Sequence, residues 1–202
     1  MEIEFKDREI ICNKNFLNLD KFTFDFCSVL NQTKINYVII SGYIPVFFGR
    51  NRTSEDIDMF IDKIPLEEFK EIWEKLKTNN FECINTKDYE KAYSSYLCNG
   101  DSIRFALKNT FIPNIEIKFR KKILDKKAMD EKIKIISNDK ITYFGPLELQ
   151  IVYKLFLDSE KDIEDARFLF KLFKNKLKKE EIKKISNYLN VKNKLHSIGW
   201  EE

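Results

Sequence analysis

Histidine and closely spaced cysteines are almost absent from this sequence. The one histidine is His196, and the four cysteines form no Cys-x-x-Cys pair: Cys12, Cys27, Cys83 and Cys98. This scarcity argues against a zinc site of the usual kind, which needs several such ligands at characteristic spacing. Widely spaced cysteines are typical of a reducing cytosol, where each serves as a small buried hydrophobe. We therefore expect buried cysteines and a surface histidine.

Long apolar runs are also missing. No run approaches the roughly 20 residues that a membrane span needs. The first residues, Met-Glu-Ile-Glu-Phe-Lys, carry charges where a secretory signal has an apolar stretch. The sequence therefore predicts a cytoplasmic protein with no membrane partner. Charged residues make up 34% at a formal net charge of +3, a balance that does not indicate a disordered tail.

What the chain does contain is enough apolar material for one core, with 43% hydrophobic residues and 18 Phe. Apolar and alternating stretches predict strands, and apolar residues at helical spacing predict helices. Strands are expected at 3–12, 37–40, 56–61, 81–84, 103–107, 115–119, 133–136 and 141–144. Helices are expected at 19–31, 43–49 (beginning near Pro45), 65–77, 146–157, 162–175 and 179–190. The pattern predicts an α+β fold, with a mixed-sheet core at 1–145 and a helical segment at 146–202.

The most informative stretch contains two carboxylates, Asp56 and Asp58, in a short strand. Residues spaced i, i+2 on a strand point to the same face, so these like charges lie close together. Such a pair needs a cation to compensate it, and a divalent metal with oxygen ligands is the natural one. An apolar run at 37–40 and a Ser41-Gly42 turn precede the pair. The alternative is a solvent-facing edge strand with ordinary carboxylates.

Residues 37–61 resemble the active-site signature of the polymerase β-like nucleotidyltransferase superfamily. The run from Arg52 to Asp58, which reads Arg-Thr-Ser-Glu-Asp-Ile-Asp, is most similar to the AbiEii-type and minimal nucleotidyltransferases. Many of these are toxins of toxin–antitoxin pairs. Two later stretches, 147–154 and 161–165, resemble the helical Lys motif and the Lys-Asp-x-x-Asp motif of that subgroup.

The resemblance implies a metal site for Mg²⁺ or Mn²⁺ with three carboxylates, of which Asp56 and Asp58 are the first two. Glu116 is the best candidate for the third, because it alternates with apolar residues in the strand 115–119. The family more often has Asp at this position. By analogy Glu116 would also help to deprotonate the acceptor hydroxyl. The alternative is an ion pair of Glu116 with Arg104 or Lys118.

The resemblance also implies a set of nucleotide-binding residues: Ser41, Gly42, Arg52, Thr53, Lys154, Asp162 and Asp165. The turn would present backbone N–H groups to the triphosphate, although the family usually has Gly-Gly or Gly-Ser rather than Ser-Gly. Arg52 and Lys154 would contact phosphates. The alternatives are a salt bridge of Arg52 with Glu55 or Asp62, and capping of a helix by Asp162.

The expected function is transfer of a nucleoside monophosphate from an NTP to a hydroxyl acceptor, with RNA (including the tRNA 3′ end) or a protein as the acceptor. A cognate antitoxin would be a further partner. Two alternatives stay open: a catalytically inactive nucleotide- or partner-binding module, and a small-molecule nucleotidyltransferase of the antibiotic-modifying type. Basic stretches at 120–122, 126–127 and 174–184 are candidates for an RNA footprint, or else solvated helix faces.

Overall fold

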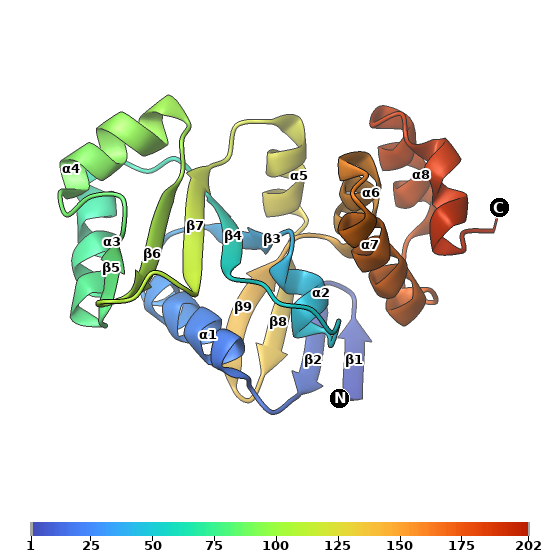
Figure 1. The fold of residues 1–202 in the computed structure, drawn as a ribbon, viewed down its shortest axis with the longest axis horizontal. Helices are drawn as coiled ribbons and strands as arrows, with labels where there is room; N and C mark the ends of the chain where they lie inside the picture. The colour runs from blue at the N-terminus through green and yellow to red at the C-terminus, as the bar shows by residue number, and fades with distance from the viewer. Residues whose placement is uncertain (1, 202) are drawn as a thin grey trace.

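The computed structural model describes residues 2–201, which form one large mixed sheet with helices packed around it (Figure 1). The strands are β1 (Glu2–Lys6), β2 (Glu9–Asn13), β3 (Tyr37–Ile40), β4 (Asp56–Ile61), β5 (Phe81–Cys83), β6 (Ile103–Leu107), β7 (Asn114–Phe119), β8 (Ile133–Ser137) and β9 (Lys140–Phe144). Within the described residues the nine strands follow the order β1-β2-β8-β9-β3-β4-β7-β6-β5.

The strand that carries the two aspartates, β4, lies inside this sheet rather than at its edge. It pairs antiparallel with β3 and parallel with β7. The strand β6 then pairs antiparallel with β7, as expected for neighbouring strands. Strands covered on both faces read as nearly continuous apolar runs, and the β3 sequence Tyr-Val-Ile-Ile follows that rule. The solvent-facing edge strand that was the alternative for Asp56 and Asp58 is therefore excluded.

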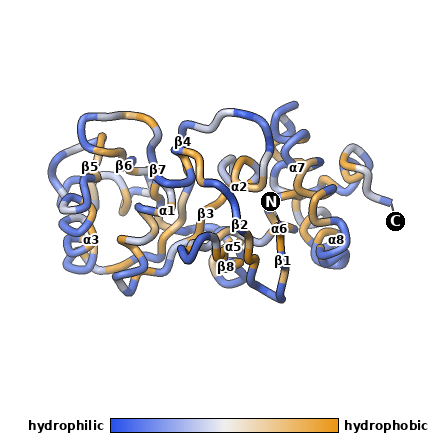
Figure 2. The backbone as a smooth tube through the Cα atoms, turned by 90° about the horizontal axis from the view of Figure 1, so that it is seen from below, coloured by the Kyte–Doolittle hydropathy of each residue, from blue (hydrophilic) through white to orange (hydrophobic). Residues whose placement is uncertain are grey.

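Helices cover the sheet and gather beyond its end. They are α1 (Asn18–Asn31), α2 (Tyr43–Phe47), α3 (Leu66–Thr78), α4 (Tyr89–Lys91), α5 (Ile123–Asp130), α6 (Leu147–Leu157), α7 (Glu160–Phe173) and α8 (Lys179–Tyr188). In the C-terminal segment α6 packs against both α7 and α8, and α2 links this group to the sheet by contacting β3, β4 and α7. Figure 2 shows α6 as mainly hydrophobic and α8 as mainly hydrophilic, which agrees with the more central position of α6.

Most of the elements expected from the sequence are present, and five details differ. The expected strand at 3–12 is a hairpin of two strands, β1 and β2. Helix α5 and the helical turns at 89–99 and 192–198 were not predicted. Helix α2 begins at Tyr43, so Pro45 lies within its first turn, where the missing N–H of proline is tolerated. Helix α7 begins at Glu160. Of the four cysteines, Cys98 is exposed.

Two further expectations concern the surface and the membrane. His196 is exposed, as predicted. Among residues 2–201, no helix combines the length and the apolar character needed to cross a bilayer. The last strand ends at Phe144 and α6 begins at Leu147. The division of the chain into a core and a separate helical unit stays a prediction.

Candidate functional site

The turn between β3 and α2 is held in an unusual backbone conformation. Ser41 has φ +65°, in the left-handed region that favours glycine. Its N–H donates to Oε1 of Gln150 on α6 at 2.8 Å. The Ser41 N–H is therefore already engaged by Gln150, contrary to the expectation that it is directed at a triphosphate. Gly42 has helical φ and ψ.

The two aspartates of β4 face two polar residues of β7 in register. Asp56 pairs with Asn114, whose Nδ2 donates to Oδ1 of Asp56 at 2.5 Å. Asp58 pairs with Glu116 in the same register. The predicted same-face arrangement thus extends to a group of four side chains on adjacent strands. Burial raises the pKa of Asp58, and the neighbouring charge of Glu116 raises it further.

Glu116 is 8% exposed and both of its carboxylate oxygens are engaged. Oε2 accepts from Nε and Nη2 of Arg104 at 2.9 and 2.6 Å, and Oε1 lies 2.5 Å from Nζ of Lys118. Burial alone would raise the pKa of Glu116, but the hydrogen bonds from Lys118 and Arg104 outweigh it, so the pKa lies below its ordinary value. The ion pair considered as the alternative role for Glu116 is therefore present, and with both cations.

Arg52 reaches across to α7. Its Nε and Nη2 donate to the two oxygens of Asp165 at 3.0 and 2.8 Å, in the bidentate geometry that guanidinium and carboxylate favour. Further donations go to the carbonyl oxygens of Gly42 at 2.8 Å and Thr53 at 2.9 Å. The local salt bridges with Glu55 or Asp62 considered for Arg52 do not form. The arginine instead ties the turn after β3 to the C-terminal helices.

Lys154 of α6 is 2% exposed and its ammonium lies between two carboxylates of α7. Nζ is 2.9 Å from Oδ1 of Asp162 and 2.9 Å from Oδ2 of Asp165, which is 0% exposed. The capping of α7 by Asp162 that was considered is wrong, because Ser159 is the N-cap and accepts from the Asp162 N–H at 3.2 Å. Asp162 is therefore a partner of Lys154.

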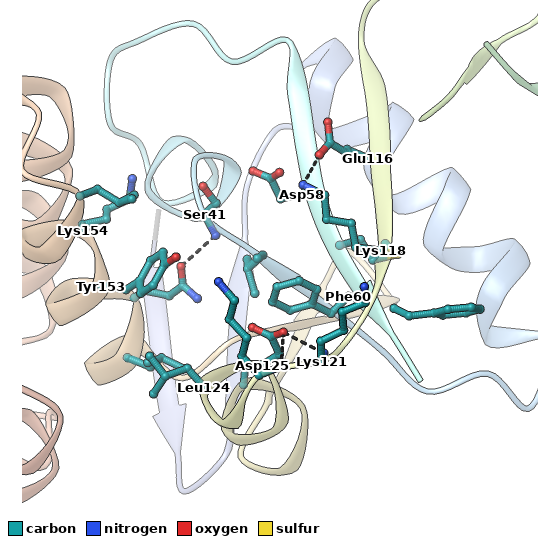
Figure 3. Close-up of a pocket in the computed structure, with 18 of the residues that line it drawn as sticks. Ser41, Asp58, Phe60, Glu116, Lys118, Lys121, Leu124, Asp125, Tyr153 and Lys154 are labelled. Atoms are coloured by element: carbon teal, nitrogen blue, oxygen red, sulfur yellow. Dashed lines mark hydrogen bonds and ion pairs between the residues drawn. The ribbon is translucent and has the colours of Figure 1, made fainter. Parts of the chain in front are cut away.

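Two adjoining cavities open on this group of residues. A cavity of about 300 Å³ is lined by the turn, the loop before β4, both aspartates and the start of α7: Ser41, Gly42, Arg52, Thr53, Ser54, Glu55, Asp56, Asp58, Lys154, Lys161 and Asp162. A cavity of about 380 Å³ lies on the other side of Asp58 and includes Glu116, Lys118, Lys121 and Tyr153 (Figure 3). Ser41, Asp58 and Lys154 line both cavities.

All three carboxylates and all seven nucleotide-binding candidates thus lie in one region of the molecule, and each role stays a prediction. Sequence reasoning missed Gln150 and Asn114 as parts of the site. Their signal was available: Gln150 lies within the stretch 147–154, and Asn114 directly precedes the expected strand 115–119. Nothing in the spacing of the sequence could show that Gln150 reaches back to residue 41.

The fold resembles a solved structure, the crystal structure of an antigenic nucleotidyltransferase-like protein from Paracoccidioides brasiliensis. The TM-score is 0.55 at 15% sequence identity, and the match covers 90% of this chain and 92% of that chain. No family model and no curated protein matches the sequence. At this level of identity the likeness shows the fold alone. The described residues therefore have a nucleotidyltransferase-like α+β fold.

The carboxylates fit a divalent cation only in part. Hard cations such as Mg²⁺ prefer carboxylate oxygens, and Asp56 and Asp58 present them from one face of β4. Burial and the charge of Glu116 disfavour ionised Asp58, a cost that a bound cation would offset. Within residues 2–201, however, no group of three or more acidic, His or Cys side chains is arranged to hold a metal. The aspartate pair fits the ion, whereas both carboxylate oxygens of Glu116 are engaged by Arg104 and Lys118.

Proposed function

We propose that this chain is a nucleotidyltransferase that transfers a nucleoside monophosphate from an NTP to a hydroxyl acceptor and releases pyrophosphate. One observation carries the proposal: a single cavity is lined both by Asp56 and Asp58 and by the cations Arg52, Lys154 and Lys161. Nucleotidyl transfer needs this combination, because positioning and charge neutralisation supply most of the catalysis of phosphoryl transfer.

Each residue of the cavity has a definite task in this proposal. Asp56 and Asp58 would hold Mg²⁺ or Mn²⁺, which when bound neutralises phosphate charge and polarises the α-phosphate. Lys161 lines the cavity at the start of α7 and would contact the triphosphate together with Arg52. The acceptor oxygen forms a bond to the α-phosphorus, the bond from the α-phosphorus to the bridging oxygen breaks, and the hydroxyl proton passes to water.

Arg52 and Lys154 reach this cavity with part of their charge already engaged by Asp162 and Asp165. A buried cation that is fixed by a carboxylate is held in one position, so it loses little side-chain entropy when a phosphate arrives. Asp165 is therefore a positioning residue in this proposal. It contacts Arg52 and Lys154 rather than the nucleotide.

The test is turnover of labelled NTPs in the presence of Mg²⁺ and total RNA, with the four NTPs tested one by one. Asp58→Asn should lose Mg²⁺-dependent turnover, because the aspartate pair no longer binds the ion. Asp139→Asn, in the exposed β8–β9 turn, is the matched control and should turn over NTP normally. Equal turnover in Asp58→Asn and the wild type would contradict the proposed role of the aspartate pair in nucleotidyl transfer.

The resemblance to AbiEii-type enzymes extends this proposal to an RNA acceptor, such as a tRNA 3′ end, and to a toxin with a cognate antitoxin. The lysines along the larger cavity, Lys118, Lys121 and Lys122, favour an anionic acceptor over a cationic small molecule. A catalytically silent binding module is the second candidate function. The observation that favours it is the engagement of Glu116 by Arg104 and Lys118.

A further inference from the structure

The ammonium group of Lys118 lies beside the candidate metal site, where it pairs with Glu116. Asp58 and Glu116 lie side by side in register on β4 and β7, and Lys118 follows two residues after Glu116 on the same face of β7. In Figure 3 the Lys118 side chain extends along the cavity wall to Glu116, next to Asp58. Its Nζ lies 2.5 Å from Oε1 of Glu116.

This arrangement compensates the repulsion between the carboxylates of Asp58 and Glu116. Two carboxylates on adjacent strands repel each other unless a cation lies near both. In this chain the cation is part of the protein, because Lys118 supplies it from the neighbouring position on the same strand. A second divalent ion bound by Asp58 and Glu116 would have to approach the ammonium group, and like charges at that distance repel.

Arg104 engages the other carboxylate oxygen of Glu116. Its guanidinium binds Oε2 of Glu116 through two nitrogens, and its backbone N–H donates to Oδ1 of Asn85 at 2.7 Å. Both Glu116 oxygens therefore point at protein cations. A carboxylate held in this way can serve as an anchor for Lys118, but it has no oxygen left for a metal ion unless an ion pair breaks.

We propose that Lys118, anchored by Glu116, is the resident cation on the acceptor side of this site, and that the divalent ion is held by Asp56 and Asp58 without Glu116. This inference rests on the proposed function and specifies the charge arrangement of the same site. Lys118 lines the larger cavity, which adjoins Asp58. From there the ammonium group stabilises the negative charge that develops on an attacking oxygen, a task that a second metal ion performs in two-metal sites.

The first measurement is Mn²⁺ affinity, followed by calorimetry and by the electron paramagnetic resonance of free Mn²⁺. Lys118→Met keeps the length of the side chain and removes its charge. Arg104 remains in the variant, so Glu116 stays paired and the fold is preserved. We expect Mn²⁺ to bind about tenfold more tightly, equivalent to about 1.4 kcal/mol, because a repelling charge has gone.

Lys122→Met removes another lysine of the same cavity and should leave Mn²⁺ affinity unchanged. Unchanged affinity in Lys118→Met would overturn the inference.

The second measurement separates an anchor from a ligand by removing both charges at once. The variant Glu116→Gln/Lys118→Met loses one negative and one positive charge, so the net charge near Asp58 stays the same. If Glu116 is an anchor, Mn²⁺ affinity should stay within about threefold of the wild type. If Glu116 is a metal ligand, affinity should fall by about tenfold or more, and the inference is wrong.

Asp58→Asn separates failure of the inference from failure of the proposed function. Mn²⁺ binding that depends on Asp58 but is lost in the double variant contradicts only the assignment of Glu116 and Lys118. Mn²⁺ binding that is unaffected by Asp58→Asn, or absent in the wild type, contradicts the proposed function and this inference together. Thermal unfolding midpoints of all variants show whether each has folded.

Discussion

At the scale of single residues, the Ser41-Gly42 turn places two different demands on two neighbouring positions. Ser41 adopts φ +65°, where a side chain is strained. Gly42 has ordinary helical angles, but a Cβ there would lie 2.9 Å from Nη2 of Arg52. Backbone strain therefore favours glycine at the first position, and a side chain at the second would have to displace the end of Arg52. Both features explain why Gly-Gly suits this turn.

A matched pair of variants isolates the backbone strain at this position. Ser41→Gly and Ser41→Ala both remove the hydroxyl, and they differ mainly in their tolerance of positive φ. We expect Ser41→Gly to be more stable than Ser41→Ala by about 1 kcal/mol in urea unfolding. Equal stability of the two variants would show that the left-handed conformation relaxes in solution.

At the scale of elements, one carboxylate joins the C-terminal helices to the sheet. Asp165 on α7 is fully buried and binds Arg52 from the loop before β4 and Lys154 from α6. Its neighbour Glu164 is half exposed and pairs with Arg50 and Arg167 at 2.9 Å. Buried and exposed ion pairs differ greatly in their effect on stability, because only the buried partners lose water.

Asp165→Asn should therefore destabilise the protein by about 3 kcal/mol, because it leaves buried cations without a full countercharge. Glu164→Gln is the control from the same helix turn and should cost less than about 1 kcal/mol. Urea unfolding of the two variants measures both values. A loss in Asp165→Asn that is no larger than the loss in Glu164→Gln would mean that Arg52 and Lys154 find water or other partners.

The elements differ in how far the sequence could predict them. The apolar alternation of β6 and β7 was sufficient to predict two neighbouring strands. Helix α5 was missed because its eight residues, Ile-Leu-Asp-Lys-Lys-Ala-Met-Asp, are too few to show helical periodicity. The spacing of Asp56 and Asp58 was sufficient to place them on one face. Arg104 and Lys118 were also expected from the sequence as possible partners of Glu116, and the structure has both. The pairing of Arg52 with Asp165 was not predicted, because helix docking brings together residues that are far apart in sequence.

At the scale of the whole molecule, several paired carboxylates link stability to pH. Asp62, Glu116 and Asp162 each have a pKa below the ordinary value, because hydrogen bonds from neighbouring cations and other donors outweigh the opposing effect of burial. A lowered pKa in the folded state means that the unfolded chain binds protons first. The resulting stabilisation is complete above the unfolded pKa of about 4 and is lost as the pH falls below it. Asp58, with its raised pKa, acts in the opposite sense.

We therefore expect the urea midpoint to fall progressively as the pH is lowered from about 5 to about 2. Asp162→Asn should reduce this pH dependence, because one of the paired carboxylates is gone. Asp58→Asn should instead raise the midpoint at neutral pH, because it removes a buried carboxylate beside Glu116. A midpoint in the wild type that is independent of pH over this range would contradict the assigned ion pairs.

The distribution of basic residues over the molecule sharpens the prediction of an RNA footprint. Of the three basic stretches, the one at 120–122 borders the larger cavity, which Lys121 and Lys122 line. Arg120 itself is paired with Asp62. Lys127 lies within 2.8 Å of carboxylate oxygens of Glu131 and Glu181. Lys183 and Lys184 of α8 form i, i+3 pairs with glutamates of the same helix. Of the three basic stretches, the one at 120–122 therefore supplies the cations that line the proposed acceptor cavity, Lys121 and Lys122.

If the acceptor is RNA, its binding should release counterions from these lysines. The slope of log affinity against log salt should then be about −0.7 for each phosphate contact, the value for single strands. The variant Lys121→Ala/Lys122→Ala should make the slope less steep by about 1.4, and Lys183→Ala/Lys184→Ala on α8 should not change it. Filter binding with tRNA between about 50 and 200 mM salt measures both slopes. Equal slopes in the two variants would show that Lys121 and Lys122 are not part of the RNA footprint. If no complex forms at the lowest salt, the acceptor is not RNA. That result would still allow NTP turnover on a hydroxyl of a protein or a small molecule.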